Sequence, residues 1–177
     1  SNLLKKTIFI FIILIYFLKY NIVKKNLEQL INVFIMTNVV IAGTGMVRFG
    51  KFPNRSIKSM VNSVVNESIK DANCNVNDIQ QVFFGNAASG LLTGQECIQG
   101  QAALRNTNLL GKPIINIENA CASSSTAFNV AIAAIQSGQC KAVIVIGAEK
   151  MTSNDRQAPI RALEASTDLD DLEAIKK

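Results

Sequence analysis

Histidine and tryptophan are absent from this 177-residue sequence. Without an imidazole, the chain alone cannot complete a Ser-His-Asp hydrolase site, a histidine-ligated zinc site or any catalysis that relies on a histidine base. Cysteine is scarce, and the spacings between Cys74, Cys97, Cys121 and Cys140 match neither a metal-binding nor a redox pattern. We therefore expect an intracellular chain in a reducing compartment; the cytoplasm, a mitochondrion and a peroxisome are not distinguished.

Charged residues are also few, at 18% of the chain against 49% apolar residues, which favours a folded core over disorder. The net charge of +5 is concentrated in the first 35 residues, which hold five lysines and one glutamate. Residues 36–177 carry a net charge of only +1. This balance gives no support to nucleic-acid binding by the main body of the chain.

An unbroken apolar run from Ile8 to Leu18 lies between lysines in this first segment. As a helix it would be roughly 16 Å long, about half the thickness of a bilayer core, and therefore too short to cross it. No small-residue cleavage pattern follows, as a signal peptide would require. We expect residues 1–35 to be a hydrophobic and basic leader outside the fold. A targeting or membrane-surface segment and a core helix are the alternatives.

Regular alternation begins after Met36. Short β-branched runs predict strands at 38–42, 81–85, 114–117 and 142–146, and apolar residues at helical spacing predict helices at 57–73, 95–106 and 122–137. Gly43 and Gly45 are interpreted as a turn at a strand end. The alternation predicts an α/β domain over 36–156 with a largely parallel sheet covered by helices. Residues 157–177 form a polar tail, with at most a short helix in 163–177.

Cys121 follows the third predicted strand and opens the third predicted helix. Ligands gather at the carboxyl ends of parallel strands, and a helix N-terminus favours the thiolate form of a cysteine. The helix behind it is uncharged and rich in small residues, so we expect it to be buried on all sides. From position alone, Cys121 is either a catalytic nucleophile or an inert buried thiol.

Three blocks of sequence resemble the thiolase family in its amino-terminal half. They are Glu118-Asn-Ala-Cys-Ala-Ser-Ser-Ser-Thr-Ala127, Phe84-Gly-Asn-Ala-Ala-Ser-Gly90 with Gly100-Gln-Ala-Ala-Leu-Arg105 after it, and Gly147-Ala-Glu-Lys-Met151. The third block, together with Gly45-Met-Val-Arg-Phe49, is most similar to the sterol-carrier-protein type of thiolase. Ser124 departs from the family, which more often has glycine there.

The resemblance implies a thiolase-like amino-terminal fold and the activity of an acyl-CoA C-acyltransferase, either an acetyl-CoA acetyltransferase or a 3-ketoacyl-CoA thiolase. It makes Cys121 the nucleophile that accepts the acyl group, with its own backbone amide in the oxyanion hole. A coenzyme A thioester is then the substrate, with no permanently bound cofactor and no metal, and the full-length family form is a homodimer. A second half of the family supplies a histidine and another cysteine, so this chain alone is expected to be inactive.

Two other functions remain open, namely a non-catalytic thiolase-like interaction fragment and a β-ketoacyl synthase relative; Gly147-Ala-Glu-Lys-Met151 disfavours the second. Glu118 is either an acid-base group or a capping group. Arg105 either reaches a phosphate or a subunit interface, or simply lies on a solvated face. Cys97 is expected in core or interface packing, and Cys74 and Cys140 are expected to have no specific role.

Overall fold

The computed structural model describes residues 10–17 and 38–171 of the chain. Five strands form one sheet in the order β2-β1-β5-β3-β4. Their bounds are Ile10–Phe17 for β1, Val39–Met46 for β2, Gln81–Gly85 for β3, Ile114–Ile117 for β4 and Ala142–Ala148 for β5. The four strands predicted from the sequence are all confirmed, and β1 is additional.

The sheet contains the expected parallel part, formed by β4, β3 and β5, and an antiparallel part, formed by β1 with its two neighbours. Strand β3 runs parallel to both β4 and β5, whereas β1 is antiparallel to both β5 and β2. Four of the five strands therefore point the same way, and their carboxyl ends meet at one edge of the sheet. This edge is where helices begin and where ligands bind in α/β folds.

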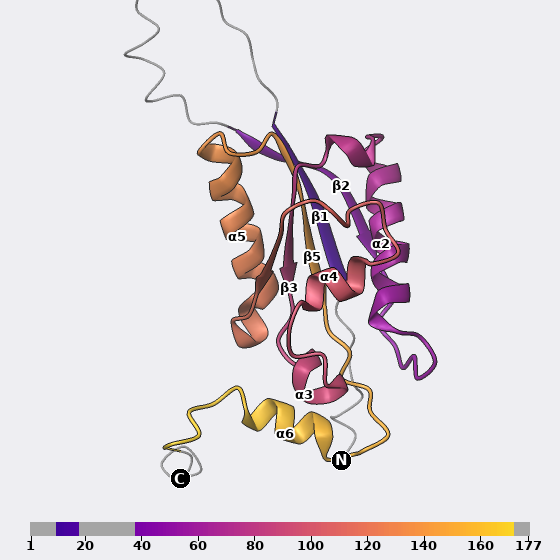
Figure 1. Cartoon of the computed structure of the whole chain (residues 1–177), viewed down its shortest axis with the longest axis vertical. Coiled ribbons are helices and arrows are strands. Elements are labelled where there is room, and N and C mark those ends of the chain that lie inside the picture. Colours follow the sequence, from indigo (N-terminus) through magenta and orange to yellow (C-terminus); the bar gives the residue numbers. More distant parts are fainter. Residues whose placement is uncertain (1–9, 18–37, 172–177) are drawn as a thin grey trace, which may run out of the picture.

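Helices cover both faces of the sheet, giving three layers (Figure 1). On one face lie α2 (Ile57–Asp71) and α4 (Gln99–Leu104), and on the other lies α5 (Ser123–Gln136). Each face of the sheet has its own hydrophobic core. Phe84 packs in the core on the α2 side, and its neighbour Phe83 packs in the core on the α5 side. The same alternation along β5 sends Ile144 and Ile146 one way and Val143 and Val145 the other.

Strand β1 differs from the sequence-based expectation for residues 1–35. The structure pairs Ile10–Phe17 with β2 on one side and β5 on the other, so this part of the leader lies inside the sheet. An unbroken apolar run that is rich in aromatic and β-branched residues favours a strand. The remaining leader, residues 1–9 and 18–35, lies outside the described residues.

Helix α2 begins as predicted at the Ser56 cap, whose side chain accepts a hydrogen bond from the N–H of Ser59 at 3.1 Å. The glycines before it do not form a strand-end turn, because Gly43 and Gly45 lie within β2. A Cβ atom on Gly45 would lie 2.4 Å from the carbonyl oxygen of Val64 in α2. Gly45 therefore allows the helix to pack closely on the strand.

Helix α5 is buried on one face only. Its buried residues are Ser123, Ala127, Ala131, Ala134 and Ile135. On the opposite face Val130 is 39% exposed. The expectation that the helix is buried on all sides is therefore wrong for this chain by itself.

The predicted helix at 95–106 is shorter in the structure, where α4 covers only part of that range; α3 (Ser89–Thr93) precedes it and was not predicted, and an irregular segment separates the two. Gly94 and Ile98 in that segment both have left-handed backbone conformations, with φ of 79° and 51°. In the expected tail, α6 (Ala158–Glu164) packs beside α3 and ends where a helix at 163–177 was expected to start (Figure 1). None of the helices within 38–171 is both long and apolar enough to cross a bilayer.

Candidate functional site

Cys121 lies between β4 and α5, in the short 3₁₀ helix η2 (Ala120–Ala122) that runs directly into α5. Its side chain is exposed. The structure therefore places the predicted nucleophile at the carboxyl edge of the sheet and at the start of a 14-residue helix, as the sequence indicated. An exposed thiol at this position is open to an incoming reagent, unlike an inert buried thiol.

Hydrogen bonds from its neighbours hold the turn that carries Cys121. The backbone N–H of Asn119 donates to Ser123 Oγ at 2.8 Å, and that hydroxyl donates to the carbonyl oxygen of Ala120 at 2.8 Å. The backbone N–H of Ala122 donates to the carbonyl oxygen of Asn119 at 2.9 Å. Residues on both sides of Cys121 are thus tied to each other across it.

Glu118 also stabilises this turn. Its Oε1 accepts a hydrogen bond from the backbone N–H of Ala120 at 2.7 Å, which is the capping role that the sequence offered as one of two interpretations. An ionised carboxylate is a strong acceptor for such an amide. Glu118 therefore has a structural role: it holds the amide of Ala120, the residue directly before Cys121.

The residue before the nucleophile has a strained backbone. Ala120 has a φ of 45°, in the left-handed region that costs a residue with a side chain roughly 1–2 kcal/mol. Such conformations persist where the surrounding structure enforces them, and they cluster at functional sites. Sequence reasoning missed this feature, because alanine gives no signal of a positive φ.

Close packing on the strand side fixes the first turn of α5. A Cβ atom on Gly85, the last residue of β3, would lie 2.9 Å from both the backbone N and the Cα of Ser124. Ser124 stands where the family that the sequence resembles more often has glycine. In the structure it is the strand residue, Gly85, that provides the room.

The other cysteines are not brought into the site by any contact in the described residues. Cys140 is buried and its Sγ donates to Gln81 Oε1 at 3.2 Å, while Cys74 is half-buried. Burial raises the pKa of both thiols, and the charge of Asp78 adds to the rise for Cys74. Cys97 is exposed in this chain, so of the expected core or interface packing the core alternative does not apply.

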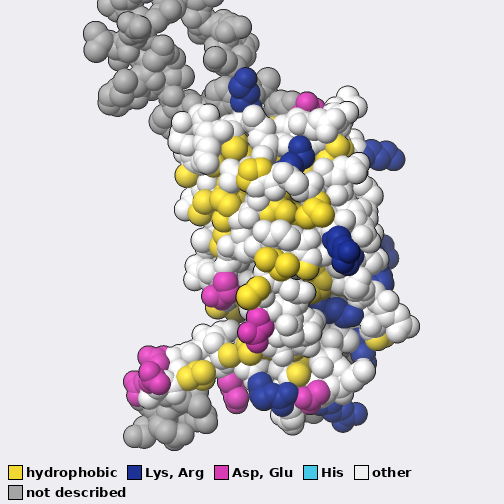
Figure 2. All heavy atoms as spheres, viewed as in Figure 1, with side chains coloured by type: hydrophobic (Ala, Val, Ile, Leu, Met, Phe, Trp, Pro, Cys, Tyr) yellow, Lys and Arg dark blue, Asp and Glu magenta, His cyan; other side chains and the backbone are white. Residues whose placement is uncertain are grey.

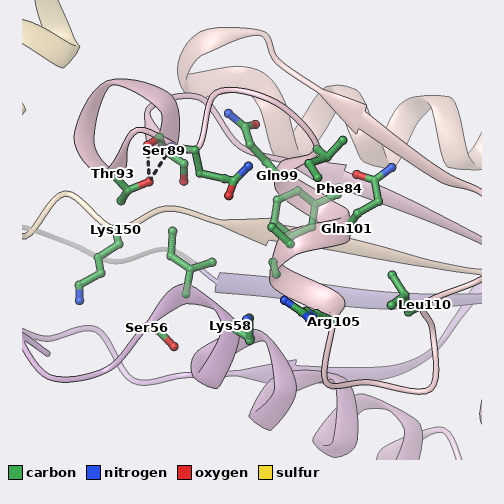
Figure 3. Close-up of a pocket in the computed structure, with 15 residues that line it drawn as sticks. Ser56, Lys58, Phe84, Ser89, Thr93, Gln99, Gln101, Arg105, Leu110 and Lys150 are labelled. Atoms are coloured by element: carbon green, nitrogen blue, oxygen red, sulfur yellow. Dashed lines mark hydrogen bonds between the residues drawn. The ribbon is translucent and has the colours of Figure 1, made fainter.

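A cavity of about 720 Å³ lies on the α2 and α4 side of the sheet (Figure 3). Three cations contribute to its lining, Lys58, Arg105 and Lys150, and Cys121 is not among the lining residues. Lys150 Nζ is already engaged, because it donates to the carbonyl oxygens of Arg55 at 2.6 Å and Pro53 at 3.2 Å. Arg105 is exposed at this cavity, a placement that fits both a solvated face and contact with a phosphate.

The space-filling view shows the α4 and α5 side of the molecule with scattered apolar side chains and no histidine (Figure 2). Within residues 10–17 and 38–171, no group of three His, Cys, Asp or Glu side chains is arranged to hold a metal ion. The candidate site consists of an exposed thiol on a hydrogen-bonded turn at the start of a helix.

Known proteins with similar sequences point to one family. The family described as "Thiolase, N-terminal domain" matches residues 39–174. An acetyl-CoA acetyltransferase from Methanocaldococcus jannaschii is 35% identical over 117 residues, which is 66% of this chain and 30% of that protein. A non-specific lipid-transfer protein-like 2 from Caenorhabditis elegans is 35% identical over 136 residues, covering 73% of this chain and 32% of its own length. Bovine sterol carrier protein 2 is 30% identical over 64% of this chain and 20% of its own length. The chain thus spans a third or less of each of these relatives.

Proposed function

Because the chain belongs to the thiolase family, through that family's N-terminal domain, we propose that it is the nucleophile-bearing part of an acyl-CoA C-acyltransferase. The observation that carries the proposal is Cys121, an exposed thiol on a strained and hydrogen-bonded turn at the start of α5. Relatives named acetyl-CoA acetyltransferase add support for acetyl transfer, although they are similar proteins and not this one.

In the proposed reaction the Cys121 thiolate attacks the carbonyl carbon of an acyl-CoA thioester. A bond forms between Sγ and that carbon, the bond from the carbon to the sulfur of coenzyme A breaks, and the proton from Cys121 ends on the departing sulfur. The product is an acyl-cysteine, which divides acyl transfer into two easier steps. The coenzyme A thioester is a substrate, and this step needs no bound cofactor or metal.

The backbone around Cys121 is suited to support the charge that develops on the carbonyl oxygen. Amides in the first turn of a helix have no intrahelical acceptor, and the N–H of Cys121 lies at the start of η2 and α5. We assign this N–H to the oxyanion. A donor that is already held in place by the surrounding turn needs no reorganisation when the charge appears.

The later steps need groups that these 177 residues do not contain. The sequence has no histidine to take the proton from Cys121. We propose that residues beyond this sequence, on the same chain or another, provide that base and the second cysteine that the family uses. On this proposal the 177 residues alone accept an acyl group slowly and do not catalyse carbon-carbon bond formation or thiolysis.

We further propose that the full-length protein is a homodimer. The support comes from a difference between the two outer strands of the sheet: β2 has backbone amides bonded to a helix of the same chain, whereas β4 exposes an apolar side chain. The N–H groups of Thr44 and Met46 in β2 donate to carboxylates of α2, Asp71 at 2.8 Å and Glu67 at 3.1 Å. At the opposite edge β4 exposes Ile115 by 39%, which suits a strand that is covered by another subunit.

Acyl acceptance can be tested directly on this chain. The protein is incubated with acetyl-CoA or acetoacetyl-CoA, and intact mass spectrometry follows the added acetyl group. An adduct that disappears in Cys121→Ala and persists in Cys97→Ala supports the proposal, because Cys97 is the other exposed thiol in the described residues. A wild-type chain that remains folded and takes no adduct excludes intrinsic acyl acceptance.

One observation favours the second candidate function, a non-catalytic interaction fragment. The uncovered face of α5 presents Ser125, Asn129, Val130 and Ala133, which are uncharged and exposed. Light scattering after size-exclusion chromatography tests it. A folded monomer that stays monomeric at high concentration counts against the interaction fragment and leaves the acyltransferase proposal untouched.

A further inference from the structure

Glu149, the first residue after β5, holds the loop that follows β3. Its carboxylate is half-buried, and Oε2 accepts hydrogen bonds from the backbone N–H groups of Ala87 at 2.9 Å and Ala88 at 3.0 Å. Two consecutive amides of one loop are therefore anchored to a strand that is 61 or 62 residues away in the sequence.

Asn86 extends this anchor to three strand ends. Its side chain is buried, with Oδ1 accepting from the N–H of Ser89 at 3.1 Å and Nδ2 donating to the carbonyl oxygen of Ala148 and to Glu149 Oε1 at 3.4 Å. Its own backbone N–H donates to the carbonyl oxygen of Ile117 at 3.2 Å. The carboxyl ends of β3, β4 and β5 are thus joined through Asn86 and Glu149.

Both flanks of this network lead to the nucleophile. Gly85, directly before Asn86, lies against Ser124 in the first turn of α5. Ile117, whose carbonyl oxygen accepts the hydrogen bond from Asn86, is the last residue of β4, and the chain continues from it into the Cys121 turn. A shift of the loop at 86–88 would therefore displace β4 before Cys121 and the first turn of α5 after it.

We infer that Glu149 is a positioning residue for Cys121. It holds the loop at 86–88 in place, and this loop in turn fixes Gly85 and Ile117, which support the turn that carries Cys121. The inference rests on the proposed function, in which Cys121 is the reacting group. Glu149 works through backbone amides, so the length of its side chain matters more than its charge. Its place in Gly147-Ala-Glu-Lys-Met151 was visible in the sequence, but its partners were not.

The test measures how fast each thiol of the 177-residue chain reacts with iodoacetamide, by intact mass spectrometry and peptide mapping. This reagent needs no acyl-CoA, so a chain that alkylates normally but accepts no acetyl group would contradict the proposed function alone. Buried Cys140 and half-buried Cys74 serve as internal reporters, because any loosening of the whole fold exposes them. Four variants are compared: Glu149→Ala, Glu149→Asp, Glu149→Gln and, as the matched control, Glu164→Ala on the exposed side of α6.

We expect Glu149→Ala and Glu149→Asp to slow alkylation of Cys121 several-fold, because a thiol that moves away from the start of α5 loses the local environment that favours its reaction. Glu149→Gln keeps one acceptor oxygen for the amides of Ala87 and Ala88 but replaces the second, which accepts from Asn86 Nδ2 at 3.4 Å, by an NH2 donor. It therefore restores part of the rate, and more than Glu149→Asp does. Glu164→Ala behaves as wild type. In every variant Cys74 and Cys140 keep their wild-type protection.

Two results would overturn the inference. One is an unchanged Cys121 rate in a folded Glu149→Ala or Glu149→Asp variant. The other is a parallel rise at Cys74 and Cys140, which would make Glu149 a residue of general stability. If Glu149→Ala does not fold, the comparison of aspartate with glutamine decides, and equal Cys121 rates in those two variants reject a role that depends on reach.

Discussion

Gly85 at the end of β3 lies so close to Ser124 in α5 that a single methyl group would not fit between them, since its carbon would be 2.9 Å from the backbone N and Cα of Ser124. The atoms on both sides belong to the backbone, so neither can turn away as a flexible side chain would. The contact sets the distance between the sheet and the first turn behind Cys121.

Gly85→Ala should therefore move that turn. Forcing a methyl group into a packed site costs roughly 1–3 kcal/mol, and we expect a loss of this order in the free energy of unfolding measured with urea. Acetyl adduct formation at Cys121 should fall as well. Gly50→Ala is the control, because its added methyl group meets only the ring of Phe52, at 3.2 Å. Equal stability of the two variants would show that the strand and helix can separate without cost.

Strain at Ala120 gives a prediction of opposite sign. Glycine adopts a positive φ without the steric cost that alanine bears at 45°. Ala120→Gly should raise the free energy of unfolding by about 0.5–1 kcal/mol, after the larger entropy that glycine loses on folding is subtracted from the relief of strain.

The neighbouring substitution Ala122→Gly is the matched control, because Ala122 has an ordinary φ of −93° and gains nothing from glycine. It should lower the free energy of unfolding in the same urea titration. Two variants that change stability equally and in the same direction would mean that the left-handed conformation of Ala120 carries no strain.

The raised pKa values of the two covered thiols predict how stability changes at alkaline pH. Burial raises the pKa of Cys140 and Cys74 above the ordinary value of 9.0. The folded chain then keeps these protons to a higher pH than the unfolded chain does. Their contribution to stability is fully present below pH 9 and is lost as the pH rises through the folded-state values.

Urea titrations at a series of pH values from neutral to alkaline measure this loss. Cys140→Ala should flatten the decline above pH 9, because one of the two linked protons is removed. Cys97→Ala, at an exposed thiol, should keep the wild-type slope. A slope that is the same in both variants would show that Cys140 does not contribute to the alkaline decline.

The sequence was sufficient for the elements whose signals are local. Four strands, the Ser56 cap of α2 and the place of Cys121 at a helix start all follow from neighbouring residues, and the structure confirms them. The thiolase resemblance read from the Cys121 block is confirmed by the family match over residues 39–174. Local patterns suffice here because alternation, capping and helix starts involve residues that are close in the chain.

Features that depend on distant contacts were missed. The bonds between Glu149 and the amides of Ala87 and Ala88 join segments that no local pattern connects. The break between α3 and α4 depends on Ile98, whose left-handed φ of 51° is unusual for a β-branched residue. The exposed face of α5 could not be foreseen either, because small uncharged residues indicate a covered helix without saying what covers it.

Strand β1 is the largest difference between expectation and structure, and it yields the last prediction. In the part of the chain that the structure describes, β2 pairs with β1 alone, and β1 joins it to β5. Removing residues 1–35 would leave the inner backbone groups of β2 and β5 without partners. Unpaired strand edges expose amides that associate with other chains.

The truncated chain should therefore unfold at a lower urea concentration than the full chain and should form larger species in light scattering after size-exclusion chromatography. A shorter deletion of residues 1–7 keeps β1 and is the control, which should behave as the full chain does. The substitution Ile13→Pro gives a second test, because Ile13 pairs with Thr44 on one side and Val145 on the other, and proline cannot donate to either neighbour. A chain without residues 1–35 that is as stable and as monomeric as the full chain would restore the original expectation that the leader lies outside the fold. It would also mean that β2 finds its place beside β5 without β1.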